Sequence, residues 1–523
     1  MFTATIEECR ENRDKETDEL QKRIRELETT EIGDWNKIYA MNFTQLQNAL
    51  RTARAVRAHR LTNCVARWIG EAEETAEALD QAFADASTRP SLFGVPISVK
   101  EHIRIKGYDA TSGFASLLGQ PSSKTAQSVQ ALVGAGAVPF CMGNVPQTLT
   151  CVGCDNPIYG TTRNPLNDGG NQLTPGGSSG GEGALTAMGG NVFGLGSDGG
   201  GSCRLPAAMC GVCGYKPTST RVSQLGTCNT VPGALKGIGG TKGVIAREVD
   251  AVVAGVRALF DYPPLRGDPY RVTSKFAEEV YTDSKPLTIG YYCDDGVFEP
   301  VAQVKDAVMR AVAHLKTKGH TLVPWKMPEA QRAYEACIAG FLNDGGVCLT
   351  EQIQKDVPAE LNNNLYKFFD PSSRAGFLAD KGPLFKSLGE ALPTTPTDCR
   401  RAFAFVDEFK YRVCAEWDAL ALDAVVCPPA PCPPIQHRHA IESLMMAAYT
   451  APYNTLDFAA GVVTVGRVSA DEEYEGERVD ADVRRVLQQA TFVGLPLAVQ
   501  VAARHGEDEM ALRVMKELQD LSA

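Results

Sequence analysis

The first 85 residues follow a helical hydrophobic pattern. Apolar spacing predicts three helices, at 5–30, 43–56 and 69–84. In the first, which is otherwise charged, Leu20, Ile24 and Leu27 recur every three or four residues and form one apolar stripe. We expect this stripe to pack on the body of the protein, because a partner-binding coiled coil needs about three heptads and about one is visible.

From Leu92 onward, short β-branched runs alternate with helical patterns and with glycine or proline turns. Strands are expected at 95–99, 137–142, 192–196, 287–292, 322–325 and 424–429. Helices are expected at 184–187, 244–260 and 301–318, and one helix is expected to end at 129–134. This alternation predicts an α/β fold, in which a sheet carries helices on both faces.

Residues 361–400 break this alternation. Aromatic side chains such as Phe368 and Phe377 are interleaved with lysine and arginine, and prolines divide the segment into short helices. One interpretation is an insertion that packs its own small core. The other is a mobile apolar cap that touches a membrane surface or admits a lipid, since exposed aromatics flanked by cations suit an interface. The periodicity is too short to decide between them.

Composition and charge exclude several classes of protein. The chain has 523 residues, of which 44% are hydrophobic and 22% charged, as in an ordinary soluble protein. Its net charge of −11 argues against a nucleic-acid partner. The sequence contains no run of 18 consecutive apolar residues, so no transmembrane helix is expected. The N-terminus is too charged for a secretory signal. We therefore expect an intracellular protein, either cytoplasmic or peripherally associated with a membrane.

The chain contains 16 cysteines, four of them in two Cys-x-x-Cys pairs. These pairs are Cys151/Cys154 and Cys210/Cys213. The gap between them is far longer than zinc sites use, and the second pair lies in a run of small apolar residues. We interpret these cysteines as buried thiols, which behave as small hydrophobic residues, and we expect no metal site.

The glycine-rich segment 174–217 carries the main candidate chemistry. Ser202 follows Gly199, Gly200 and Gly201, so that several backbone N–H groups are free to converge on one point. Such a nest suits the oxyanion that develops when a nucleophile attacks a carbonyl. A flexible turn is the alternative interpretation of the same glycines.

A serine nucleophile needs a proton acceptor. None of the seven histidines lies in a motif typical of a catalytic triad, although His102 is only two residues after Lys100. There is also no Gly-x-Ser-x-Gly elbow of the α/β-hydrolase kind. Lys100 is a better candidate, because it ends an apolar strand, and burial would lower the pKa of its amine. The alternative is a lysine paired with Glu101. Ser178, in the glycine-rich run 175–181, could relay the proton.

Taken together, residues 176–184 and 198–206 resemble the amidase signature family, with Cys203 in a position where that family usually has an aliphatic residue. The resemblance covers nearly the whole chain. It implies a helical segment at 1–85, followed by one catalytic α/β domain at 86–523 with a twisted mixed sheet between helices. It also implies a catalytic triad of Ser202, Ser178 and Lys100, without a cofactor.

Further segments, at 136–140, 210–218 and 493–500, resemble the fatty acid amide hydrolases of that family. This likeness implies lipid amide substrates such as N-acylethanolamines and a cis peptide bond before Ser178. It implies that Asp198 and Arg204 brace the loop. The residues implied to contact the substrate or hold the oxyanion are Leu149, Ser178, Gly199, Gly200, Gly201 and Ser202. Two alternative functions remain open: hydrolysis of small amides or esters, and a role as an ammonia-supplying subunit. A homodimer and contact with a membrane surface are also possible.

Overall fold

A single sheet of eleven strands runs through the computed structural model, which describes residues 2–29, 43–166, 172–229, 231, 238–263, 268–357, 363–439, 442–470 and 473–522. In spatial order the strands are β1 (Val65–Trp68), β3 (Val138–Gly143), β2 (Pro96–Lys100), β4 (Phe193–Asp198), β6 (Thr241–Ala246), β5 (Cys213–Lys216), β10 (Ala459–Arg467), β11 (Pro496–Ala503), β9 (Ala424–Cys427), β7 (Thr288–Tyr291) and β8 (Thr321–Pro324). Strand β2 is parallel to both of its neighbours, whereas β10 is antiparallel to both of its own, so the sheet is mixed.

Helices cover both faces of this sheet, and strand β6 shows how the sequence arranges this. Val244 and Ala246 belong to the main core together with Val252 of α8 (Val249–Asp261). Ile245, between them, belongs to a separate cluster with Ala207 of α7 (Arg204–Cys210). Because successive side chains of a strand point to opposite faces, α8 and α7 lie on opposite sides of the sheet. The predicted α/β fold is confirmed.

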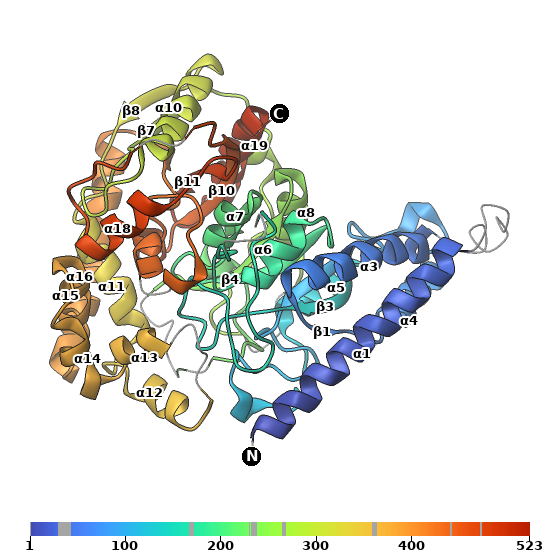
Figure 1. Cartoon of the computed structure of the whole chain (residues 1–523). Coiled ribbons are helices and arrows are strands. Elements are labelled where there is room, and N and C mark those ends of the chain that lie inside the picture. Colours follow the sequence, from blue (N-terminus) through green and yellow to red (C-terminus); the bar gives the residue numbers. More distant parts are fainter. Residues whose placement is uncertain are drawn as a thin grey trace.

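Two further groups of helices lie on opposite sides of the sheet's centre (Figure 1). The N-terminal group, in blue, contains α1 (Phe2–Thr29), α3 (Phe43–Thr62) and α4 (Ala72–Ala82). The other group, in yellow and orange, contains α11 (Ala330–Phe341), α12 (Val347–Gln354), α13 (Asn363–Phe369), α14 (Pro371–Leu378), α15 (Pro383–Glu390) and α16 (Pro396–Ala419). The other helices are α5 (Gln127–Gly134), α6 (Gly180–Ala187), α9 (Glu278–Tyr281), α10 (Ala302–Thr317), α17 (Ala451–Thr455), α18 (Ala481–Gln489) and α19 (Asp508–Gln519).

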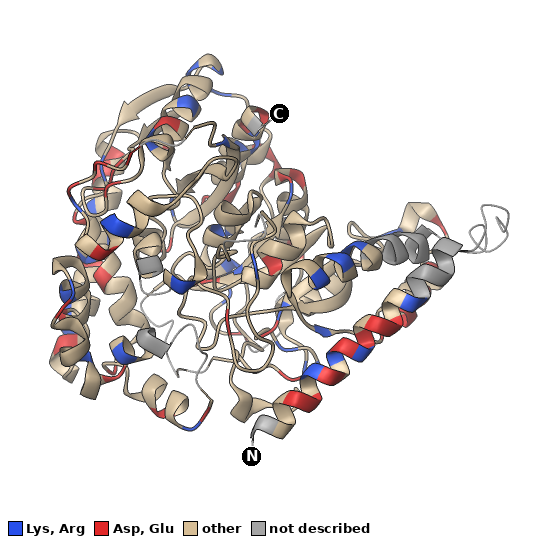
Figure 2. Cartoon of the chain, in the orientation of Figure 1, with Lys and Arg blue, Asp and Glu red and all other residues tan. Residues whose placement is uncertain are grey.

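Helix α1 contacts the body through several polar side chains. Arg10 Nε donates to the Ile158 carbonyl oxygen at 2.6 Å, and Trp68 Nε1 donates to Thr17 Oγ1 at 3.0 Å. Leu20 of the predicted stripe packs beside a small apolar cluster of α3 and β1, whereas the side chains of Ile24 and Leu27 lie outside the described residues. Acidic and basic side chains alternate along α1 (Figure 2). The predicted helical segment 1–85 also contains β1, an edge strand of the sheet.

Some sequence-based expectations for secondary structure were wrong. The predicted helix at 244–260 is divided, because residues 244–246 belong to strand β6 and α8 begins at Val249. Strands β1, β5, β10 and β11 were not predicted. Both β10 and β11 are central strands that are almost fully buried, so their sequences are nearly continuous apolar runs rather than alternating ones. Such runs lack the period of two that identifies a half-exposed strand.

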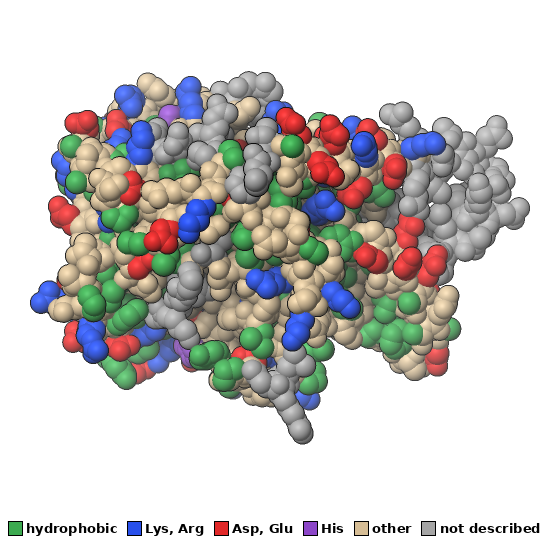
Figure 3. Space-filling view, turned by 90° about the horizontal axis from the view of Figure 1, so that it is seen from below, with side chains coloured by type: hydrophobic (Ala, Val, Ile, Leu, Met, Phe, Trp, Pro, Cys, Tyr) green, Lys and Arg blue, Asp and Glu red, His purple; other side chains and the backbone are tan. Residues whose placement is uncertain are grey.

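The described part of segment 361–400 packs inward. Phe368, Phe369 and Phe385 are buried in the main core, and Phe377 is half-buried against it. Among the described residues of this segment, no large hydrophobic side chain is exposed. On the face seen in Figure 3, hydrophobic side chains are interspersed with charged ones of both signs. The described rings of this segment are therefore packed inward, as the insertion interpretation expects, and a cap that touches a membrane surface or admits a lipid stays an untested prediction.

No helix in the described ranges is both long and apolar enough to cross a membrane. The four cysteines of the two Cys-x-x-Cys pairs are buried thiols, as expected. Burial raises the pKa of Cys151, Cys154 and Cys213 to about 12. Within those same ranges, no cluster of three or more His, Cys, Asp or Glu side chains is arranged to hold a metal ion.

Candidate active site

Lys100 ends strand β2, whose five residues are all buried. The side chain of Lys100 is fully buried, and its Nζ donates to Ser178 Oγ at 2.7 Å and to Ser197 Oγ at 2.9 Å. Glu101 does not pair with it, because the Glu101 carboxylate accepts from the backbone N–H groups of Thr111 and Ser112, at 2.7 and 2.9 Å. The alternative of a Lys100–Glu101 ion pair is thus wrong. Burial lowers the pKa of Lys100 to about 8.

Ser178 lies in the glycine-rich loop that leads into α6. It is buried, and the peptide bond between Gly177 and Ser178 is cis, as the resemblance implied. A Cβ atom on Gly177 would lie 2.4 Å from the carbonyl oxygen of Cys151, so no larger residue fits there. This close packing holds the Ser178 hydroxyl against Lys100 Nζ.

The loop that carries Ser202 is held by a buried ion pair. Asp198, the last residue of β4, pairs with Arg204 at 2.9 Å, and both side chains are fully buried. Burial alone would raise the pKa of Asp198, but Arg204 outweighs it and holds that pKa well below its ordinary value. Arg204 also donates to Gln500 Oε1 at 2.7 Å and to Asn454 Oδ1 at 2.5 Å. Asp198 and Arg204 therefore brace the loop, as expected.

The backbone N–H groups before Ser202 have different partners. The N–H of Gly201 donates to Asp198 Oδ1 at 2.8 Å, so it is already occupied. Among the described contacts, none occupies the N–H groups of Gly199, Gly200 or Ser202. Thr450 Oγ1 donates to the carbonyl oxygen of Gly200 at 2.7 Å and fixes that peptide. Of the four N–H groups predicted to hold an oxyanion, that of Gly201 is thus engaged elsewhere, and the other three have no described hydrogen bond.

Gly201 also needs to be glycine. Its φ is +132°, and a Cβ atom would lie 2.2 Å from Thr450 Oγ1. Behind Ser202, the N–H of Ser179 donates to the Ser202 carbonyl oxygen at 3.2 Å. The two serine loops are therefore joined directly, and Ser178 and Ser202 line the same cavity.

Ser202 lies where two cavities meet, and these differ in character. The polar chamber includes Ser178, Ser197, His102 and Lys242. The apolar chamber is lined mainly by hydrophobic side chains from α11 and the residue that follows it, from the 361–400 segment and from the 3₁₀ helix Glu442–Ala448; they are Tyr334, Ile338, Phe341, Leu342, Phe368, Phe369, Leu388 and Leu444. A group bonded to Ser202 could therefore extend in one direction into a polar space and in the other into an apolar one.

Leu149 lines both chambers. It and Thr148 have φ values of +62° and +76°, a conformation that side chains other than glycine rarely adopt. Such local strain is typical of functional sites. The structure thus brings Leu149 to the junction, beside Ser202.

Sequence reasoning missed Ser197 as a member of this site. Ser197 Oγ accepts from Lys100 Nζ and is 2.8 Å from His102 Nε2. Burial, with a smaller effect of the two nearby lysines, lowers the pKa of His102 well below its ordinary value, so the ring is neutral. His102 thus contacts the lysine's partner; no hydrogen bond to Ser202 is described for it. The sequence signal that could have pointed to this group of contacts was the position of His102, two residues after Lys100.

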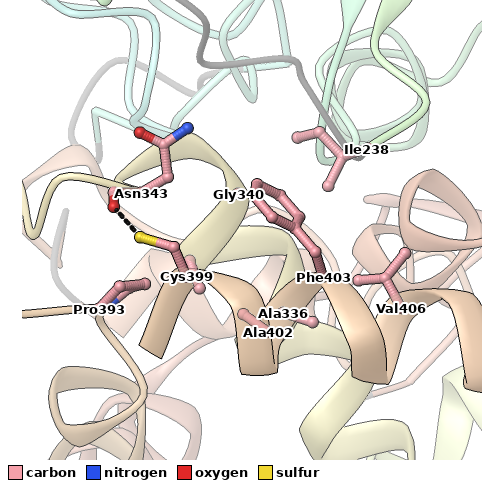
Figure 4. A pocket seen from close by; sticks show the side chains of 10 residues that line it. Ile238, Ala336, Gly340, Asn343, Pro393, Cys399, Ala402, Phe403 and Val406 are labelled. Carbon is pink, nitrogen blue, oxygen red and sulfur yellow. Dashed lines mark hydrogen bonds between the residues drawn. The ribbon is translucent and has the colours of Figure 1, made fainter. Parts of the chain in front are cut away.

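A separate small apolar cavity lies between α11 and α16 (Figure 4). Ala336, Gly340 and Phe403 contribute to it, and at its edge Cys399 Sγ donates to the carbonyl oxygen of Asn343 at 2.8 Å. None of the predicted site residues lines this cavity.

Comparison with known proteins gives a consistent result. The sequence model of the family described as Amidase matches residues 49–512. The chain is 33% identical to fatty acid amide hydrolase 1 of Caenorhabditis elegans, over 98% of this chain and 92% of that protein. It is 35% identical to fatty-acid amide hydrolase 1 of Sus scrofa, over 92% of this chain and 83% of that protein. A solved structure of a fatty acid amide hydrolase shares the fold, with a TM-score of 0.79 at 24% identity, covering 92% of this chain and 82% of that one.

Proposed function

Since this chain belongs to the amidase signature family and is an amide-hydrolysing enzyme, we propose that it cleaves long-chain fatty acid amides through Ser202, Ser178 and Lys100. The observation that carries this proposal is the buried contact of 2.7 Å between Lys100 Nζ and Ser178 Oγ, at the junction of a polar and an apolar chamber. A buried amine of lowered pKa is a competent base near neutral pH.

In the mechanism we propose, neutral Lys100 accepts the Ser178 proton while Ser178 accepts the proton of Ser202. Ser202 Oγ attacks the amide carbon, and the backbone N–H groups of Gly199, Gly200 and Ser202 stabilise the oxyanion. Ser178 then donates its proton to the nitrogen as the C–N bond breaks and takes a proton back from Lys100, so that a neutral amine leaves and Lys100 is neutral again. Water attacks the resulting ester by the same relay, and the carboxylic acid is released.

The two chambers give the substrate a direction. Ser178, which would protonate the leaving nitrogen, lines the polar chamber and is not part of the apolar lining. The amine therefore lies on the polar side, and the acyl chain extends among the aromatic and aliphatic side chains of the other chamber. Leu149 separates the two. A polar amine on a long acyl chain, as in N-acylethanolamines, fits this division.

The acyl-chain assignment predicts a rising series of rates. Each buried methylene contributes about 0.8 kcal/mol, so kcat/KM is expected to increase by up to about fourfold per added methylene from acetamide to hexanamide, and to stay high for oleamide. Ile338→Trp, which would fill the apolar chamber, should lower the rate for oleamide and leave that for acetamide little changed. Release of ammonia measures both.

Met309→Trp is the matched control, because it enlarges an exposed side chain on α10, away from the chambers. A flat or falling series in the parent enzyme would instead favour the second candidate, an amidase or esterase of small substrates. The hydrophobic lining of the second chamber favours the lipid amide over that candidate.

The lowered pKa of Lys100 predicts a pH profile. Its amine acts as a base only when neutral, and burial places the pKa at about 8. For an uncharged amide such as oleamide, kcat/KM should therefore rise about tenfold per pH unit below pH 8 and level off above it. Steady-state rates between pH 6 and 9.5 measure this. A profile that stays flat across that range would contradict the role of Lys100.

A further inference from the structure

The polar chamber contains a second buried lysine that the proposed mechanism does not use. Lys242 lies on β6 directly opposite Ser197 of β4, so the two side chains share a face of the sheet. Its side chain is fully buried and lines the chamber in which the leaving amine would lie. Ser197 in turn contacts Lys100 and His102.

The described hydrogen-bond partners of Lys242 are all neutral groups. Its Nζ donates to the carbonyl oxygen of Ser223 at 2.9 Å and to Gln224 Oε1 at 3.0 Å. An ammonium group has three N–H donors, so one remains beyond these two. In the described ranges, no carboxylate lies within ion-pair distance of Lys242. Burial lowers the pKa of Lys242 to about 7, because a buried ammonium group without an opposite charge is costly. A bound anion would remove that cost and keep the amine protonated.

The other charges around the chamber do not supply an anion either. Asp198 also lines it, but this carboxylate is neutralised by Arg204 at 2.9 Å. The remaining titratable groups of the lining are Lys242 and His102, with Lys100 directly behind Ser178 and Ser197. Among the described residues, Asp268 raises the pKa of Lys242, but it is not in ion-pair contact with it and is absent from the lining. Because His102 is neutral and Lys100 acts as a neutral base, Lys242 is the group of the described lining that could pair with an anion on the leaving amine.

From this juxtaposition we propose that Lys242 binds a carboxylate on the amine part of the substrate, so that the preferred substrates are N-acyl amino acids of small size. The inference rests on the proposed function, since it needs the amine to lie on the polar side of Ser202. The polar chamber has a volume of about 70 Å³, so it suits a small amine part. Glycine, with five non-hydrogen atoms, matches that space. Lys242 is a specificity-determining residue in this proposal, and the three catalytic residues are unchanged.

The test compares two amides that differ in one group. N-oleoylglycine and N-oleoylethanolamine share the acyl chain and release amines of similar basicity, but one carries a carboxylate where the other carries a hydroxymethyl group. In the parent enzyme, kcat/KM is expected to be about tenfold or more higher for the glycine conjugate. Hydrogen bonds to charged groups predict that Lys242→Met lowers this preference ratio by about 10- to 100-fold, whereas Lys242→Arg retains it.

Controls separate a structural effect from a loss of recognition. Lys242→Gln removes the charge but keeps donors for Ser223 and Gln224, and it serves if the methionine variant does not fold. Lys216→Met replaces another fully buried lysine, which lies outside both chambers, and should leave the ratio unchanged. A parent ratio near or below one, or an unchanged ratio in the methionine and glutamine variants, overturns the inference. Failure of the proposed function looks different: neither amide would be hydrolysed.

Discussion

Replacing Ser202 with alanine is expected to lower kcat for amide hydrolysis by about 10⁵-fold or more and to abolish covalent labelling by a fluorophosphonate probe. The reason is that the attacking oxygen is removed, and loss of a serine nucleophile typically costs this much because the remaining groups act only together with it. Labelling is measured on the purified protein, with the modified peptide identified by mass spectrometry. The expected labelled residue of the parent is Ser202.

The fold of this variant should be intact, because no described hydrogen bond uses the Ser202 hydroxyl. The carbonyl oxygen of residue 202 would still accept from the N–H of Ser179, at 3.2 Å in the parent. Ser219→Ala is the matched control: Ser219 hydrogen-bonds to Asp457 outside both chambers, so this variant should keep full labelling. If Ser202→Ala were labelled as fast as the parent, another residue would be the nucleophile, and the proposed mechanism would be wrong.

The parts of the site that could be predicted from sequence are those encoded within a few residues. An apolar strand that ends in Lys100 and a glycine run that ends in Ser202 are local patterns with a local physical meaning. The partners of these residues are not local. Ser197 lies 97 residues from Lys100, and Thr450 lies 250 residues from the Gly200 carbonyl that it fixes. No pattern within a short segment reports such contacts.

The fold shows the same division. Strands that alternate with helices, such as β2 and β7, were predicted near their observed bounds. Strands β10 and β11 were missed because they are largely buried, lack alternation and, unlike the equally buried β2, follow no predicted helix. The boundary between β6 and α8 was missed for a related reason, since an apolar strand runs into an apolar helix with two residues between them. Periodicity distinguishes half-buried elements and is weak for fully buried ones.

Replacing Lys100 with methionine is expected to have opposite effects on activity and stability. Removing the base should lower kcat by about 10²- to 10⁴-fold, the range of general base catalysis, and should remove the rise of rate through pH 8. Methionine fits the same buried space without a charge. Rates and thermal unfolding of the two proteins at matched pH measure both effects, and Lys216→Met is the control for the loss of a buried lysine at another position.

The sign of the stability effect follows from the pKa of Lys100, which burial lowers from 10.5 to about 8. Between these two values the unfolded chain binds more protons than the folded one, so the stability of the parent rises with pH across that window and is lowest below pH 8. The penalty below pH 8 is on the order of 3 kcal/mol. Lys100→Met lacks it and should unfold at a higher temperature than the parent at pH 7, with the difference shrinking toward pH 10. A variant that is both inactive and less stable at pH 7 would show that Lys100 holds the site together rather than acting as its base.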